Sequence, residues 1–196
     1  MKTASKENKK KFLIVTAANL IVAFLDLFLT YLGTPDLKLE GNVLITELFL
    51  GWPALIAVNV IVSAGMTWMA YYAYIKYKPP VTNETDMKRY LAKITYGDAD
   101  KTTFGMWKWP KYWPPQIACM CWAVTIAVPI ARMLIVLEWF FIVFHIYFPY
   151  YFRFMLLFPK ARADFFVAVI LSWILSFVWI KREFNANLKR IEAEQS

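Results

Sequence analysis

The amino-acid sequence predicts an all-α fold, a polytopic bundle of helices embedded in a membrane. Of its 196 residues, 60% are hydrophobic and only 18% are charged, whereas soluble domains carry about 25% charged residues. The apolar residues also form long runs with lysines and arginines at their ends. A soluble domain of this length needs more polar surface than this composition supplies. We therefore predict four membrane spans, with five as the alternative, and short amphipathic helices at the membrane surface.

The first span is predicted from an apolar run that follows a basic N-terminal segment, residues 1–11. The run extends from Phe12 to Leu32, and Asp26 is its only charged residue. At 1.5 Å per residue it is about 30 Å long, the thickness of a bilayer core. It lacks the shorter apolar core and small-residue cleavage pattern of a secretory signal. We therefore expect it to be retained as a membrane helix.

The second span is predicted from Trp52 to Ile75, because tyrosines and lysines of the interfacial type follow it. Residues 12–75 then form a helix pair with an outer loop, and residues 76–115 form a basic connection. This connection carries apolar residues at helical spacing, from Met87 to Ile94. We expect Thr85 to cap this short helix and Gly97 to end it. Its apolar face is expected on the membrane surface or on a partner protein.

Aromatic and basic side chains alternate just before the third span. They are Trp107, Lys108, Trp109, Lys111 and Trp113. Such alternation can stack nucleic-acid bases, but its place beside a span favours an aromatic belt at the lipid interface. The net charge of +8 is also consistent with anionic lipid. We therefore predict membrane lipids as a partner, and no nucleic acid.

The C-terminal half, residues 116–181, begins with an apolar run from 117 to 158 that is too long for one span. Pro129 and Pro149 are its candidate breaks. The last span is predicted from 165 to 180, and a charged tail, residues 182–196, follows. Four spans make part of 138–160 an outer interfacial segment, whereas five would move the tail outside. The lysine and arginine counts favour a cell-membrane protein with its N-terminus in the cytoplasm.

A stripe of polar residues marks the first span. Asn19, Asp26 and Thr30 fall within about 20° of one line on a helix that turns 100° per residue. A carboxylate facing lipid costs about 2.5–3.5 kcal/mol, so the stripe should face protein or a water-filled cavity. Asn59 and Ser63 of the second span are its expected partners.

The outer loop adds polar residues beyond this stripe. Glu40 and Asn42 precede an amphipathic piece, 43–50, which Asn42 can cap and on which Glu47 lies. Together with Asp26, the two glutamates could line an acidic mouth for a cation or proton. The alternative is that Asp26 hydrogen-bonds to Asn59 or to backbone while the glutamates are solvated.

These residues also carry a resemblance. Asp26-x3-Thr30 and Gly33, followed by Glu40-Gly41-Asn42, resemble an uncharacterised family of small prokaryotic membrane proteins, a domain of unknown function. The resemblance covers residues 12–77, and Val43 stands where that family usually has proline. Because the family has no assigned activity, the resemblance implies a fold and a polar site but no reaction.

Other reactive side chains form weaker patterns. Glu138 and His145 are seven residues apart, so they would share a helix face as a weak metal-site candidate, although metal centres need three or four ligands. We expect Glu138 to pair instead with Arg132 or Arg153. Cys119 and Cys121 would point to opposite faces of one helix, which favours neither a disulfide nor a shared metal.

The sequence shows no catalytic constellation. It has one histidine, no Gly-x-Ser-x-Gly motif and no glycine-rich phosphate loop. We therefore predict no enzyme activity, no metal and no cofactor. The favoured function is an accessory, non-catalytic subunit of a larger membrane complex, with other integral membrane subunits as partners. The alternative is a small ion or proton conductor that uses Asp26 and the acidic mouth.

Overall fold

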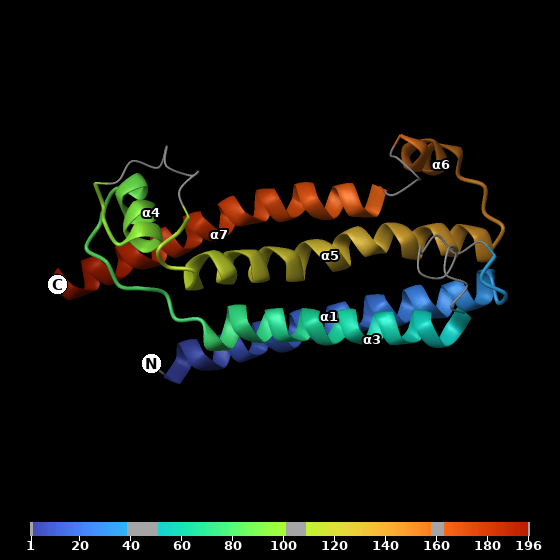
Figure 1. Cartoon of the computed structure of the whole chain (residues 1–196), viewed down its shortest axis with the longest axis horizontal. Helices are drawn as coiled ribbons and strands as arrows, with labels where there is room; N and C mark the ends of the chain where they lie inside the picture. The colour runs from blue at the N-terminus through green and yellow to red at the C-terminus, as the bar shows by residue number, and fades with distance from the viewer. Residues whose placement is uncertain (1, 39–50, 101–108, 158–162, 196) are drawn as a thin grey trace.

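The computed structural model of the protein describes residues 2–38, 51–100, 109–157 and 163–195, which form helices joined by turns and loops and contain no strands (Figure 1). The elements are α1 (Lys2–Gly33), α3 (Gly51–Tyr71), the π-helical turn η1 (Tyr72–Lys76), α4 (Met87–Tyr96), α5 (Pro114–Val143), α6 (Pro149–Leu156) and α7 (Ala163–Gln195). Four of them, α1, α3 with η1, α5 and α7, are long and apolar enough to cross a membrane. The predicted all-α, multi-pass membrane fold is confirmed.

Successive long helices run in opposite directions, so α1 and α5 run from the terminal side of the bundle to the other side and α3 and α7 run back, with α5 in the middle (Figure 1). Helices α1 and α3 lie on one side of α5, and α7 packs against it on the other side. Both chain termini and α4 lie at one end of the molecule, which we call the terminal end. Helix α6 lies at the opposite end, the α6 end.

Two apolar clusters hold α5 in this central position. At the terminal end, Trp122 of α5 packs with Ala70 of α3, Tyr74 of η1 and Trp179 of α7. Toward the α6 end, Val136 and Trp139 of α5 pack against α1. Gly33 permits this second contact, because a Cβ atom there would lie 2.7 Å from the Trp139 ring. Burial of large aromatic side chains therefore brings α1 and α5 close together.

The long apolar run breaks at only one of its two predicted positions. Helix α5 continues through Pro129 and ends at Val143. His145, with a positive φ of 55°, lies in the turn that follows, and Pro149 begins α6, where its missing N–H is tolerated. At eight residues, about 12 Å, α6 is too short to span a bilayer, so the described residues contain four candidate spans, the predicted number, rather than five.

The connection and the C-terminal tail form a compact unit, the terminal annex, defined as residues 77–100 together with α7 from 181 to 195. Tyr90 of α4 is fully buried, and its ring lies 5.5 Å from that of Phe184. The prediction that the apolar face of α4 lies on membrane or on a partner is therefore wrong. It is wrong because α7 continues as one helix through the charged tail to Gln195 and covers that face.

The ends of α4 are set by local capping chemistry. Asp86, rather than the predicted Thr85, caps its N-terminus by accepting hydrogen bonds from the backbone N–H groups of Lys88 and Arg89, each at 3.0 Å. Gly97 ends the helix as predicted, in a left-handed conformation with φ 76°.

Candidate functional site

The polar site of the molecule is an ion pair between two membrane helices. The carboxylate of Asp26 in α1 accepts a hydrogen bond from Nε of Arg132 in α5 at 2.7 Å. The Arg132 Nη2 atom lies 2.6 Å from the same carboxylate oxygen. The Asp26 side chain is 16% exposed and the Arg132 side chain is 20% exposed. Each charge is therefore neutralised inside the bundle rather than presented to lipid.

A third helix joins this pair through Asn59. Arg132 Nη2 donates a hydrogen bond to Asn59 Oδ1 of α3, while Asn59 Nδ2 donates to the backbone oxygen of Leu55 at 3.0 Å. A single guanidinium thus binds groups on α1 and α3 at once, which its planar fork of donors makes possible. We call Asp26, Asn59 and Arg132 the charged seam.

Asn19 makes a second polar contact between α1 and α5. Its side-chain amide donates to the backbone oxygen of Val15 at 2.9 Å and to that of Thr125 at 3.0 Å. Thr30, further along the same face of α1, is only 3% exposed. The polar stripe of α1 therefore faces α5.

The partners expected for this stripe need correction. The sequence paired it with Asn59 and Ser63 directly, but α5 supplies its main partners, Arg132 and the Thr125 carbonyl. Asn59 reaches the stripe through Arg132. Ser63 accepts a hydrogen bond from Thr67 of its own helix at 2.9 Å and lines a groove instead.

Glu138 does not form the ion pair predicted for it with Arg132, because Arg132 is bound to Asp26. Its carboxylate lies near Tyr151 of α6 and Asp164 of α7. Burial, with the carboxylates of Glu138 and Asp164 nearby, raises the pKa of the Tyr151 hydroxyl above its ordinary value. The Tyr151 hydroxyl donates a hydrogen bond to the backbone oxygen of Leu134, which fastens α6 to α5.

The candidate metal pair is also not brought together as predicted. His145 lies beyond the end of α5 in the left-handed turn, so the helical spacing that would align it with Glu138 does not hold. Within the described ranges, no three His, Cys, Asp or Glu side chains form a group that could hold a metal. Cys119 and Cys121 are buried free thiols of α5.

Several predicted residues lie outside the described residues: Glu40, Asn42, Glu47, Trp107 and Lys108. The remaining belt residues lie at the terminal end, where Trp109 is 82% exposed and its ring lies 5.7 Å from that of Trp113. The backbone N–H of Lys111 donates to the oxygen of Thr95 at 3.0 Å. The described part of the belt is therefore hydrogen-bonded to α4.

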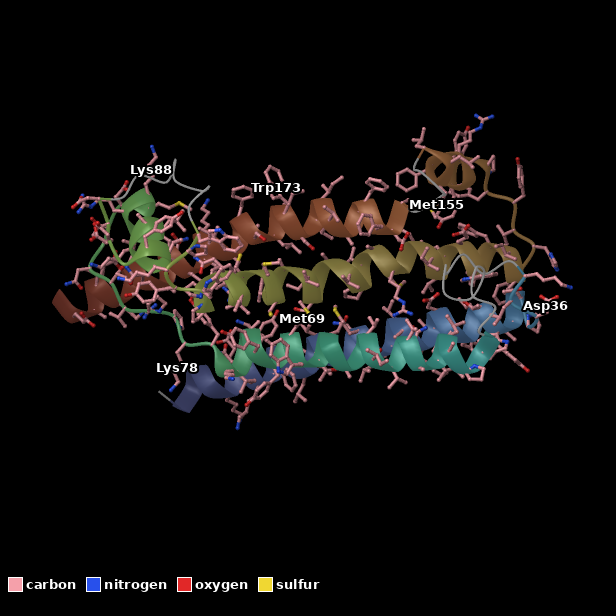
Figure 2. The ribbon with its side chains drawn as sticks, in the orientation of Figure 1. Asp36, Met69, Lys78, Lys88, Met155 and Trp173 are labelled. Atoms are coloured by element: carbon pink, nitrogen blue, oxygen red, sulfur yellow. The ribbon has the colours of Figure 1, made fainter. Side chains whose placement is uncertain are left out.

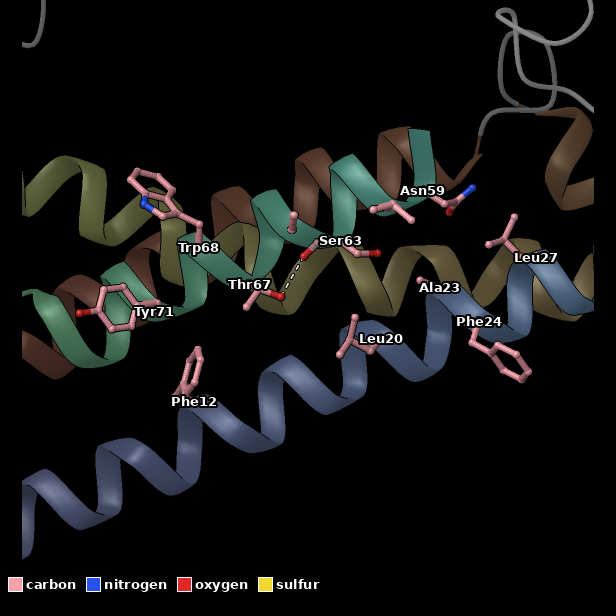
Figure 3. A pocket seen from close by; sticks show the side chains of 12 residues that line it. Phe12, Leu20, Ala23, Phe24, Leu27, Asn59, Ser63, Thr67, Trp68 and Tyr71 are labelled. Atoms are coloured by element: carbon pink, nitrogen blue, oxygen red, sulfur yellow. Dashed lines mark hydrogen bonds between the residues drawn. The ribbon is translucent and has the colours of Figure 1, made fainter. Parts of the chain in front are cut away.

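A groove of about 720 Å³ runs between α1 and α3 (Figure 3). Its lining residues are Phe12, Leu20, Ala23, Phe24 and Leu27 of α1, and Asn59, Val60, Ser63, Ala64, Thr67, Trp68 and Tyr71 of α3. At the terminal end the rings of Phe12 and Tyr71 meet edge to face, 6.3 Å apart. The opposite end of the groove reaches Asn59 of the charged seam.

Sequence reasoning placed Asp26 on a protein-facing stripe but missed Arg132 as its partner. A usable signal was present, since Asp26 and Arg132 are opposite charges inside two apolar runs, and both lie at a similar distance from the start of their run, as two helices that run in the same direction require for pairing.

No family model matches this sequence, and searches of curated proteins and of solved structures found no significant match. The resemblance over residues 12–77 therefore stays a prediction. The site itself offers charge pairing and hydrogen bonding between three helices, which is chemistry that fixes helix positions.

Proposed function

We propose that this protein is an accessory, non-catalytic subunit of a larger complex in the cell membrane. Its N-terminus and terminal annex would lie in the cytoplasm. The orientation rests on the lysines and arginines that flank the terminal ends of the spans, following the positive-inside rule. The role rests above all on the charged seam.

The charged seam supports a structural role because its groups already bind one another. Asp26 and Arg132 form a close ion pair, and both polar atoms of the Asn59 amide are bonded. A carboxylate that carries ions must exchange partners with them, whereas a buried ion pair resists separation because each unpaired charge is costly in hydrocarbon. Such a seam is suited to holding helices in register.

The outer face of α7 supports the presence of partner subunits. In the most apolar stretch of α7 only 11% of the residues are buried, whereas in that of α5 28% are buried. Its exposed side chains form a broad stripe: Phe165, Val169, Ile170, Trp173, Ile174, Phe177 and Val178. Trp173 points away from α5 (Figure 2), and its ring packs edge to face on Phe177 at 4.9 Å. A rigid aromatic ridge of this kind gives neighbouring helices a surface for close van der Waals packing.

One observation favours the second candidate, a small ion or proton conductor. Asp164 is close enough to influence both Asp26 and Glu138, so three carboxylates and Arg132 lie in the half of the bundle nearer the α6 end. A series of acidic groups at membrane depth is a feature of proton pathways. In this case Asp26 would have to leave Arg132 during transport.

The test combines cross-linking with flux. A photoreactive amino acid at Trp173 should yield one discrete protein adduct in native membranes, while the same group at Ile61, which is 70% exposed on α3, should yield lipid adducts only. Purified protein in liposomes should show no cation or proton flux above that of protein-free liposomes. Flux that Asp26→Asn abolishes, with no protein adduct at Trp173, would refute the subunit role and support the conductor.

A further inference from the structure

The groove between α1 and α3 is lined along its length by side chains of both helices. Its lining includes the small side chains of Ala23, Ser63 and Ala64, and the large rings of Phe24 and Trp68 also line it (Figure 3). Phe24 and Trp68 are 65% and 58% exposed. The groove therefore opens sideways, in the direction where a bilayer would surround the helices. Its 720 Å³ lies within the range of small-molecule sites, about 300–1,000 Å³.

Two polar side chains of the groove, those of Asn59 and Thr67, are already hydrogen-bonded within the protein. The Thr67 hydroxyl donates to the Ser63 backbone oxygen at 2.9 Å, and the Asn59 amide binds Arg132 and the Leu55 carbonyl. Most of the remaining lining residues are apolar, and such walls favour a hydrocarbon chain over a polar occupant.

The length of the groove suits a chain that begins at the terminal end. From Phe12 to Leu27 α1 rises about 22 Å, and from Asn59 to Tyr71 α3 rises about 18 Å, at 1.5 Å per residue. One leaflet of a bilayer core is about 15 Å thick. The groove thus covers one leaflet and passes slightly beyond the midplane, as a long acyl chain does.

Basic side chains continue both walls beyond the groove at the terminal end. Lys9 lies three residues before Phe12 and, by the 100° helical rotation, on the side of α1 that lines the groove; it is exposed. On the other wall, the Trp68 and Tyr72 rings stack at 5.9 Å, and Lys76 Nζ lies 5.9 Å from the Tyr72 ring. Two ammonium groups therefore flank the end where a headgroup would lie.

We propose that this groove binds one anionic glycerophospholipid, with an acyl chain between α1 and α3 and its phosphate between Lys9 and Lys76. Apolar walls select hydrocarbon, and the lysines select a lipid with net negative charge over a zwitterionic one of the same chains. In the orientation proposed above, this lipid belongs to the cytoplasmic leaflet. The site does not depend on the subunit role, because its ligand comes from the bilayer itself.

Native mass spectrometry of the purified full-length chain in mild detergent tests this site. The probes are phosphatidylglycerol and phosphatidylcholine with identical acyl chains. The expected result is one retained phosphatidylglycerol per chain, preferred about tenfold over phosphatidylcholine, a ratio that corresponds to about 1.4 kcal/mol. Lys9→Gln with Lys76→Gln should remove the preference but leave the chain contact.

A matched pair of variants separates the groove from general lipid contact. Ala64→Trp places a bulky ring in the lining of the groove and should reduce retention about tenfold, whereas Ile61→Trp places the same ring on an exposed part of α3 that does not line the groove. Both positions are exposed in the fold, so both variants should fold, which thermal unfolding verifies.

Three results would overturn the proposal. The first is equal retention of the two lipids by the wild-type chain. The second is an equal loss of retention in Ala64→Trp and Ile61→Trp. The third is a wild-type dimer that Ala64→Trp converts to a monomer, because a second copy of the chain would then occupy the groove.

Discussion

The charged seam and the terminal annex both bury polar side chains, but they satisfy them differently. In the seam, Asp26, Asn59 and Arg132 all hydrogen-bond to one another or to backbone. In the annex, the hydroxyls of Tyr77 and Tyr90 are buried with no hydrogen-bond partner in the described structure. The seam lies at a depth where lipid offers no hydrogen bonds, so its groups must find partners within the protein.

The annex is held together mainly by aromatic packing, and the pKa of a buried tyrosine reflects this apolar environment. Burial, with the Glu183 carboxylate nearby, raises the pKa of Tyr90 to about 12, since the phenolate has little to stabilise it. The ring itself packs on Phe184. The charged seam is thus stabilised by paired charges, whereas the annex is stabilised mainly by buried apolar surface. Three predictions test this difference.

The largest effect is expected from breaking the charged seam. Arg132→Met leaves the Asp26 carboxylate without its partner and should lower the free energy of unfolding by about 3–5 kcal/mol, measured by unfolding in detergent micelles. The double variant Asp26→Leu with Arg132→Met removes both charges and should recover most of that loss. A single variant as stable as wild type would show that the seam does not hold the helices.

A smaller effect is expected at the polar link within the annex. Asn187 of α7 is fully buried; its amide accepts from the Thr82 N–H at 3.2 Å and donates to the Glu84 carbonyl at 3.3 Å. Asn187→Ala leaves one buried and one partly buried backbone group unpaired and should cost about 1–3 kcal/mol. Amide hydrogen exchange should then rise in residues 82–96, with Asn185→Ala, an exposed site on the same helix, as the control. Unchanged exchange in that segment would contradict the link.

The smallest effect distinguishes the two kinds of buried hydroxyl. Tyr90→Phe removes a hydroxyl that has no partner in the described structure, so its stability should stay the same or rise by up to about 1 kcal/mol. Tyr151→Phe removes a hydroxyl bonded to the Leu134 carbonyl and should lose about 0.5–1.5 kcal/mol. Thermal unfolding of the two variants side by side measures the difference, and the same sign for both would refute the distinction.

The four spans could be predicted from the sequence because each is an apolar run of bilayer length. The break at Pro149 was also visible, whereas Pro129 stays within α5. A proline ends a helix only where neighbouring packing fails to hold it, and Ala127, Pro129 and Ala131 are all buried. Such packing cannot be read from one segment alone.

The site was predicted in part for the same reason. Helical geometry places Asn19, Asp26 and Thr30 on one face, a local property. That Arg132 pairs with Asp26 rather than with Glu138 depends on α5 packing against α1, which is a property of the whole arrangement. Likewise, the apolar face of α4 is visible in the sequence, but its cover, the extension of α7, is far away along the chain.

Helix α7 extends without interruption from the membrane into the annex, for 33 residues or about 50 Å. It packs against α5 within the bundle and, through Phe184, against Tyr90 of α4 in the annex. A tilt of about 10° in the half within the bilayer would swing the final 13 residues, about 20 Å long, through roughly 3 Å at the tip. Changes in bilayer thickness or in a neighbouring helix would thus be converted directly into movement of α4 at the aqueous end.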